Sequence, residues 1–286
     1  MTTTQRIERR LGDWMRARLP SAVADFIMFV LKQGWACLFG GALLLAIIGT
    51  RLIWQDGWGI NRYDALFVIA VGLQISFLAL KLETWAEARV IFLFHLTGTA
   101  MELFKTHVGS WSYPEEAIFR LQAVPLFSGF MYAAVGSYMA RVIRLFDMQF
   151  APSPPLVLHF GLAILAYVNF FSHHYIWDIR NILLLATLLF YVRTRIWFQI
   201  GANWYWMSLP VAAFFSSVFL WVAENIGTLT GTWIYSGQNP LDLVSLDKIG
   251  SWYLLLYVAF ATVTLVIREP LKRSPVAPRQ TTPISP

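Results

Sequence analysis

The chain has 286 residues, of which 57% are hydrophobic and 13% are charged, and its formal net charge is +6 at pH 7. A soluble domain usually has about 25% charged residues, so this composition, with its long apolar runs, predicts a multi-pass membrane protein. The single cysteine excludes an internal disulfide. The sequence has no phosphate-binding glycine loop, dinucleotide fingerprint or nucleophile elbow, so it predicts neither a nucleotide nor a nucleic-acid partner.

The predicted elements follow one another from a basic N-terminus. Residues 1–33 end in an amphipathic segment, 21–33, which we expect to form a helix at the membrane interface, with a short inserted helix as the alternative. The apolar runs that follow within 34–268 are long enough to cross about 30 Å of hydrocarbon, and none is clearly broken. They predict an all-α fold, a polytopic membrane helix bundle of about eight transmembrane helices, at residues 34–54, 63–81, 88–106, 122–144, 155–173, 180–197, 206–226 and 249–268. The proline-rich tail, 269–286, is expected to be disordered.

The basic residues are divided unevenly between the two sides of these predicted helices. With the N-terminus inside, all but six of the 22 Lys and Arg residues fall on the cytoplasmic side, as the positive-inside rule requires. The six on the opposite side are Arg51, Arg62, Lys105, Arg120, Arg180 and Lys248. The sequence therefore predicts a protein of the bacterial inner (plasma) membrane with both termini in the cytoplasm.

The pattern E-x6-G-[ST]-W-x-Y occurs twice, 122 positions apart, starting at Glu102 and at Glu224. Each copy starts near the end of a predicted helix and continues into a polar loop. Because the offset covers four helices, an even number, we predict two parallel four-helix repeats, about 34–144 and 155–268, related by an axis along the membrane normal. Coincidence in a tryptophan-rich chain is the alternative.

The first residues of the two copies, Glu102 and Glu224, are the main candidates for catalysis. A carboxylate at the edge of a membrane helix is costly, which by default indicates a function. His95 shares the helix face of Glu102 and is a third catalytic candidate. Lys105 is expected to pair with Glu102 and keep it ionised, whereas Glu224 has no such lysine. One ionised and one protonated carboxylate would serve acid–base chemistry; a purely interfacial Glu102–Lys105 ion pair is the alternative.

The aromatic residues of the two copies are candidates for substrate binding. Trp111, Tyr113, Trp233 and Tyr235 either line an apolar pocket for a lipid-like ligand or anchor the chain at the membrane interface. Pocket lining would also include Lys105, which lies between Glu102 and the loop.

A polar segment, 172–181, follows the fifth predicted helix and belongs to the same membrane face. His173, His174, Asp178 and Arg180 are further candidates for substrate binding. Adjacent histidines point in different directions on a helix, and no recognised histidine-rich metal pattern is present, so we predict no metal site. We interpret the segment as a polar cap in which Asp178 pairs with a neighbouring basic residue. No feature identifies a cofactor.

Residues 102–138 contain the strings G-S-W-x-Y-P and P-L-F-S-G-F-M-Y-x-x-V-G-S-Y. On these strings the chain resembles the YoaT-like family of uncharacterised bacterial integral membrane proteins over most of residues 20–270. A weaker likeness links the run from Glu224 to Tyr235, E-x2-G-x3-G with a trailing tyrosine, to membrane carotenoid hydratases. The chain is also similar to membrane lycopene cyclases, which repeat acidic motifs in paired halves. This likeness implies proton transfer from carboxylates to a polyene, although the P-x-E-E pattern of the cyclases is missing.

The sequence leads to two functional hypotheses. The first is a membrane enzyme that modifies an isoprenoid or other lipid, with membrane lipids and a hydrophobic small molecule as its partners. The second is a transporter or channel whose paired carboxylates bind a proton or cation. The absence of a clearly broken helix, and carboxylates near one face of the membrane, favour the first.

Overall fold

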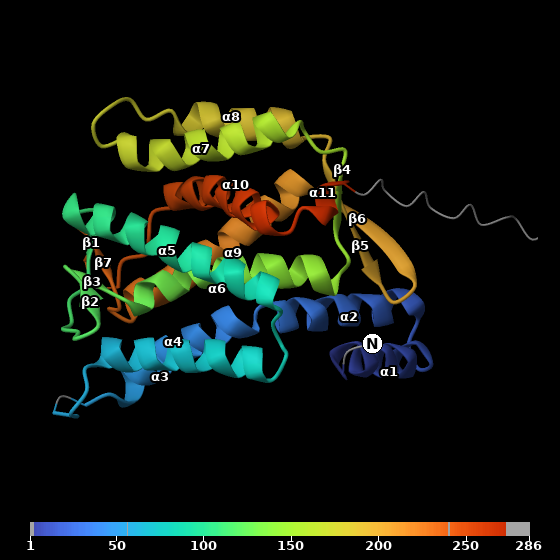
Figure 1. The fold of residues 1–286 in the computed structure, drawn as a ribbon, viewed down its shortest axis with the longest axis horizontal. Helices are drawn as coiled ribbons and strands as arrows, with labels where there is room; N and C mark the ends of the chain where they lie inside the picture. The colour runs from blue at the N-terminus through green and yellow to red at the C-terminus, as the bar shows by residue number, and fades with distance from the viewer. Residues whose placement is uncertain (1–2, 56, 240, 273–286) are drawn as a thin grey trace, which may run out of the picture.

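A computed structural model describes residues 3–55, 57–239 and 241–272. Most of this part of the chain is helical (Figure 1). The helices are α1 (Thr3–Arg16), α2 (Ser21–Ala36), α3 (Leu38–Ile53), α4 (Arg62–Ala79), α5 (Trp85–His107), α6 (Phe127–Leu145), α7 (Leu156–Ser172), α8 (Arg180–Tyr191), α9 (Leu209–Leu229), α10 (Asp247–Val266) and α11 (Glu269–Lys272). The strands are β1 (Trp111–Ser112), β2 (Arg120–Leu121), β3 (Val124–Pro125), β4 (Gln149–Ala151), β5 (Arg195–Ile200), β6 (Asn203–Ser208) and β7 (Ile234–Tyr235).

The eight predicted transmembrane segments correspond in order to the helices α3 to α10, and the first of them also includes the end of α2. The prediction of a mostly helical chain is therefore confirmed, but an entirely α-helical fold is wrong. The predicted segment 180–197 ends early, because the chain turns after Tyr191 and continues as β5. Isoleucine, tryptophan and phenylalanine favour strands as well as apolar helices, so hydropathy alone did not separate the two.

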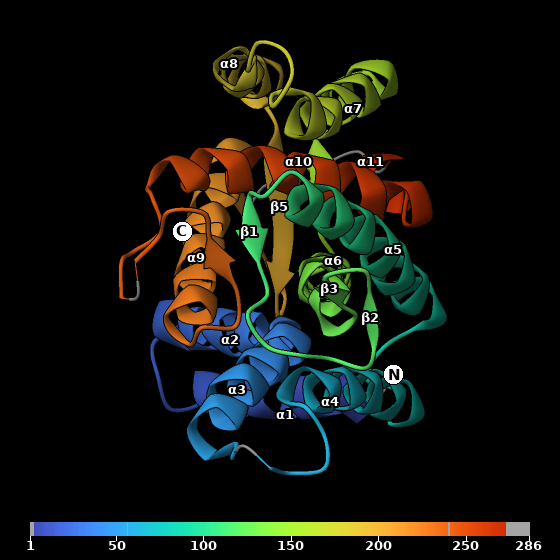
Figure 2. The same cartoon turned by 90° about the vertical axis from the view of Figure 1, so that its left-hand side faces the viewer.

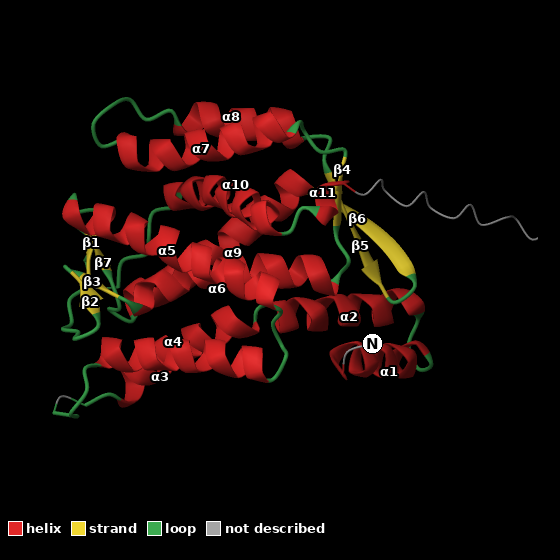
Figure 3. Cartoon of the chain, in the orientation of Figure 1, coloured by secondary structure: helices red, strands yellow, loops and turns green. Residues whose placement is uncertain are grey.

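The helices lie in layers that run along the long axis of the molecule. Figures 1 and 2 show α7 and α8 above α10, then α5, α6 and α9, and finally α2, α3 and α4 with α1 beyond them. The strands form three small sheets, β1–β7, β2–β3 and β4–β5–β6. Figure 3 shows the first two sheets at one end of the helix layers and the third at the other. We call these the motif end and the hairpin end.

The hairpin end is built on the pairing of β5 with β6. Ile196, Phe198 and Ile200 alternate inward along β5, as expected for a strand with one buried face. A two-residue loop joins the strands, with Gly201 at φ +59°, a conformation that glycine adopts without steric cost. Lys32 of α2 donates a hydrogen bond to the Gln199 carbonyl (3.2 Å), so α2 is fixed against this hairpin.

Three single helices in the described residues are long and apolar enough to cross a membrane: α4, α9 and α10. A fourth span results if α2 and α3 are taken together. These two helices are bent by 63° at Cys37, between the predicted amphipathic segment and the body of the first predicted transmembrane helix. Asp25, Met28 and Lys32 lie on the buried face of α2, whereas Phe26 and Val30 on its other face are exposed.

A buried ionic cluster joins α5 and α6 near the hairpin end. Arg141 donates to Glu83 at 2.6 Å, and both side chains are fully buried. Glu87, which forms a capping box with Thr84 at the start of α5, also accepts from Arg144. Because a buried charge is costly without a partner, these pairs fix the relative position of the two helices.

The described tail residues begin with the short helix α11, and residues 273–286, where disorder was expected, lie outside the described part of the chain.

Candidate functional site

The helices that carry the two glutamates end in the same way. Both α5 and α9 end at the motif end, at positions 122 apart (Figure 1). Gly109 and Gly231 then adopt left-handed conformations, with φ of +71° and +66°. The next N–H, of Ser110 or Thr232, donates back into the helix at 2.9 Å in both copies. This is a common way to end a helix, and it turns the chain sharply toward the bundle axis.

The turn brings the two copies of the motif into direct contact. Strands β1 and β7 pair antiparallel, with Trp111 opposite Tyr235 and Ser112 opposite Ile234. Ser112 and Ile234 are equivalent positions of the two copies, 122 apart, and they face each other. A local twofold axis that relates the two copies of the motif would therefore pass between Ser112 and Ile234.

Glu102 is buried and accepts three hydrogen bonds. Trp111 Nε1 and the Tyr113 hydroxyl both donate to Oε2 at 2.7 Å, and the Tyr132 hydroxyl of α6 donates to Oε1 at 2.9 Å. Burial, and then the charge of Glu102, raise the pKa of Tyr113 well above its usual range, so its hydroxyl keeps the proton that it donates. The carboxylate therefore lies in a cage of aromatic donors.

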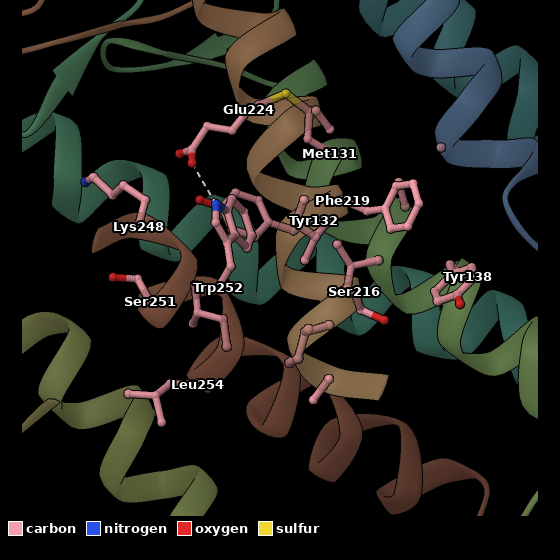
Figure 4. Close-up of a pocket in the computed structure, with 18 of the residues that line it drawn as sticks. Met131, Tyr132, Tyr138, Ser216, Phe219, Glu224, Lys248, Ser251, Trp252 and Leu254 are labelled. Carbon is pink, nitrogen blue, oxygen red and sulfur yellow. Dashed lines mark hydrogen bonds between the residues drawn. The ribbon is translucent and has the colours of Figure 1, made fainter. Parts of the chain in front are cut away.

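Glu224 lies in a similar but smaller cage. Its Oε1 accepts from the Tyr235 hydroxyl, the equivalent of Tyr113, and its Oε2 accepts from Trp252 Nε1 of α10 at 2.7 Å (Figure 4). Burial and the charge of Glu224 raise the pKa of Tyr235 in the same direction as that of Tyr113. Trp233 does not reproduce the role of Trp111, because its ring lies directly against the backbone of Gly227.

The two cages contact each other through their aromatic rings. The Trp111 ring meets the Tyr235 ring edge-on, with centroids 5.6 Å apart, a favourable aromatic geometry. Because Trp111 bonds to Glu102 and Tyr235 bonds to Glu224, these two rings form a continuous link between the carboxylates. Moving either ring would disturb both cages.

Both cages open into one cavity of about 1600 Å³. This is larger than the roughly 300–1,000 Å³ of most ligand pockets. The cavity is lined at the motif end by Trp111 and Tyr235, and at the hairpin end by Ile196 and Met207, so it extends along the bundle. Figure 4 shows Tyr138 far from the group formed by Glu224, Trp252 and Lys248.

The cavity also opens to the side of the molecule. Phe215 and Phe219 of α9 line it, yet they are 59% and 76% exposed. Most of the lining is apolar, and the polar groups are concentrated at the motif end. An amphipathic molecule with a long apolar portion matches this distribution.

One expectation for the neighbours of Glu102 is wrong. Lys105 does not pair with Glu102; its Nζ lies 2.7 Å from His174 Nε2 and 3.5 Å from His173 Nε2. Its side chain reaches the segment after α7 and not the carboxylate three residues away. His95 packs against Phe130, with ring centroids 4.5 Å apart, and is not among the residues that line the cavity.

The polar segment after α7 lies beside the cavity. His173, His174 and Arg180 line it, and Asp178 pairs with Arg180 at 3.2 Å, as the polar-cap interpretation expected. The segment between α7 and α8 is not helical, so the spacing of His174 and Asp178 does not place them on one helix face. Within the described residues, no group of three or more His, Cys, Asp or Glu side chains is arranged to hold a metal.

Sequence reasoning missed three residues of the site. Tyr132 and Trp252 are the donors that α6 and α10 contribute, and Lys248 lies over the Tyr235 ring with Nζ 4.2 Å from its centroid. The sequence contained a signal for Tyr132 and Trp252. They follow Glu102 and Glu224 by 30 and 28 residues, one on each predicted helix after a motif copy.

Comparison with known proteins identifies the family of the chain. Residues 25–260 match the family described as "Protein of unknown function (DUF817)". The uncharacterised protein YoaT of Bacillus subtilis (strain 168) is 38% identical over 243 residues, which cover 85% of this chain and 91% of that protein. No solved structure matches the chain. The resemblance predicted from the motif strings is confirmed: the chain belongs to the DUF817 family and is similar to YoaT over most of its length.

Proposed function

We propose that this protein is an enzyme of the bacterial inner membrane that modifies an isoprenoid or similar lipid by acid–base chemistry. The observation that carries the proposal is that Glu102 and Glu224 are buried at one end of a single large apolar cavity. Two buried carboxylates in matching aromatic cages are costly to maintain in a bundle of apolar helices. A role in proton transfer accounts for that cost.

The two carboxylates have unequal surroundings. Glu102 accepts three hydrogen bonds and Glu224 accepts two, and we assign the ionised state to Glu102 and the protonated state to Glu224. In the proposed reaction Glu224 donates a proton to a carbon–carbon double bond, and Glu102 accepts a proton from the resulting cation or from an added water. The faces of Trp111 and Trp233 would stabilise the positive charge between these two steps.

The shape of the cavity supports a lipid substrate. A length that reaches from Tyr235 to Met207 accommodates an extended apolar chain, and the side opening at Phe215 and Phe219 gives access from surrounding lipid.

The proposal includes the architecture of the membrane domain. In it α3 to α10 form eight transmembrane helices in two parallel repeats, with both termini cytoplasmic and the motif end outside. Two observations support a twofold relation between the repeats. The helices α5 and α9 end at equivalent positions, and Ser112 pairs with its equivalent, Ile234, in the β1–β7 sheet. Cysteine accessibility to an impermeant reagent tests the orientation: a cysteine placed at Glu116 should react from outside in a Cys37→Ser background.

Untargeted mass spectrometry of total lipid extracts tests the enzymatic proposal. Cells expressing the unaltered protein are compared with cells expressing Glu102→Gln plus Glu224→Gln at equal membrane abundance. Glu116→Gln, an exposed carboxylate at the same end, is the matched control. We expect a lipid species that changes with the unaltered protein and the control but not with the double variant. Identical extracts in a host that contains isoprenoids would reject these substrates.

A transporter is the second candidate, favoured by the bend between α2 and α3. Broken helices commonly form transport sites, and both helices line the cavity, near the Tyr138–Gln33 hydrogen bond (2.9 Å). Reconstitution in vesicles with a trapped pH dye tests this. If the unaltered protein carries a proton flux and the Glu102→Gln plus Glu224→Gln variant does not, transport is favoured. If the unaltered protein carries no proton flux, the enzymatic proposal is favoured.

A further inference from the structure

A group of basic side chains lines the motif end of the cavity next to the carboxylate cages. It comprises Lys105, His173, His174, Arg180 and Lys248, and we call it the basic cluster. Its members come from α5, the segment after α7, the start of α8 and the start of α10. Elements far apart in the sequence thus place their basic residues around the same part of one cavity.

Lys105 is the most unusual member of the basic cluster. It is 4% exposed, and no carboxylate lies within 4 Å of its Nζ in the described part of the chain. It contacts His174 Nε2 and His173 Nε2, and its Nζ lies 4.2 Å from the Phe170 ring centroid. Imidazole nitrogens and a ring face hold an ammonium group in place without neutralising it. A buried cation without an anion is costly, so an anion that enters this part of the cavity would be stabilised by Lys105.

Lys248 adds a second positive charge without an ion pair among the described residues. Its Nζ lies over the Tyr235 ring, and Figure 4 shows it on the same side of the pocket as Glu224 and Trp252. Arg180 is already paired with Asp178, and Asp242 is bonded to Asn239 in an exposed loop. Glu102 and Glu224 also line this end of the cavity, and the charge of Glu224 acts on Lys248, but neither carboxylate forms an ion pair with a lysine. Two lysines therefore provide charge that the described ion pairs do not neutralise.

The electrostatic setting of His174 agrees with this description. Burial lowers the pKa of His174, and the charges of Lys105, His173 and Lys248 lower it further. A neutral imidazole at neutral pH accepts a hydrogen bond from Lys105. The same charges attract an anion to the place where they converge.

We propose that the basic cluster binds the phosphate group of a phosphorylated isoprenoid, whose apolar chain occupies the rest of the cavity. Lys105 and Lys248, neither of which forms an ion pair, attract the charge of a phosphate monoester, about −2 near neutral pH, and Arg180 and the Nδ1–H of His174 supply further hydrogen-bond donors. The apolar lining that begins beyond the cluster receives the chain. This assignment rests on the proposed function, because it names the class of lipid that the same cavity takes.

Binding to the purified protein in detergent tests the assignment directly. The probes are geranylgeranyl monophosphate, geranylgeraniol with the same chain and no phosphate, and inorganic phosphate, each measured by microcalorimetry. We expect the phosphorylated lipid to bind the unaltered protein at least about tenfold more tightly than the alcohol. This comparison needs no variant. Equal binding of the two lipids would overturn the assignment, and inorganic phosphate binding as tightly as the phosphorylated lipid would show a site for a free anion instead.

Variants then locate the phosphate. Lys105→Gln and Lys248→Gln should each reduce binding of the phosphorylated lipid about tenfold while leaving the alcohol unchanged. Arg120→Gln, which removes an exposed charge from the motif end outside the cavity, is the matched control. Equal loss in the control would overturn the assignment.

The two proposals fail in different ways. If the phosphorylated lipid binds but lipid extracts do not depend on Glu102 and Glu224, the enzymatic proposal fails and the phosphate site stands. If the extracts change but the phosphate adds nothing to binding, the enzyme stands and the phosphate site fails.

Discussion

The contact between Gly227 and Trp233 gives a sharp test of the site. A Cβ added at Gly227 would overlap the six-membered ring of Trp233, which lines the cavity. Gly227→Ala should therefore force the indole away from α9. Gly72, in the middle of α4 with no neighbour within 4 Å of an added Cβ, is the matched control.

The magnitude follows from two opposing terms. Replacing glycine by alanine inside a helix stabilises it by about 1 kcal/mol. Overpacking costs about 1–3 kcal/mol. We therefore expect Gly72→Ala to raise the free energy of unfolding by up to about 1 kcal/mol, and Gly227→Ala to lie about 1–3 kcal/mol below that control.

A double-mutant cycle in mixed detergent and SDS micelles, followed by circular dichroism, measures this. In a Trp233→Ala background the overlap is gone, so Gly227→Ala should become as stabilising as Gly72→Ala. The coupling between the two positions should be about 1–3 kcal/mol. A coupling near zero would show that the indole does not lie against α9, and the described geometry of the second cage would be wrong.

Three further predictions concern single residues, each checked by the same unfolding measurement. Tyr132→Phe removes one of the three donors to Glu102 and should cost about 1 kcal/mol. Glu83→Gln breaks the fully buried pair with Arg141 and should cost about 3–5 kcal/mol, because it leaves an arginine buried without its partner. Gly109→Ala has open space around it but a φ of +71°, so backbone strain alone should cost about 1–2 kcal/mol.

Each of these changes has a control within the chain. Tyr167→Phe removes a hydroxyl that bonds to no described residue and should be nearly neutral; a loss equal to that of Tyr132→Phe would contradict the aromatic cage. Asp13→Asn breaks an exposed pair with Arg16 and should cost less than about 1 kcal/mol. Gly231→Ala has the same left-handed backbone as Gly109→Ala and should cost about the same; clearly unequal costs would argue against equivalent helix ends.

The sequence by itself determined that the chain is mostly helical, and it indicated the two candidate carboxylates. Long apolar runs separated by charged loops predict helices whose side chains face lipid or a protein core. Eight such runs overlap the helices α3 to α10. The repeated motif identified Glu102 and Glu224 because its spacing is independent of how the helices pack. The family resemblance depended on the same strings.

Only the tertiary structure decided which groups meet at the site. Lys105 is three residues from Glu102, yet its side chain contacts His173 and His174, since α7 brings a distant segment closer than the local neighbour. Tyr132 and Trp252 belong to the site because α6 and α10 pack beside α5 and α9. Side-chain partners across helices depend on packing, and a single sequence does not encode that packing as a local pattern.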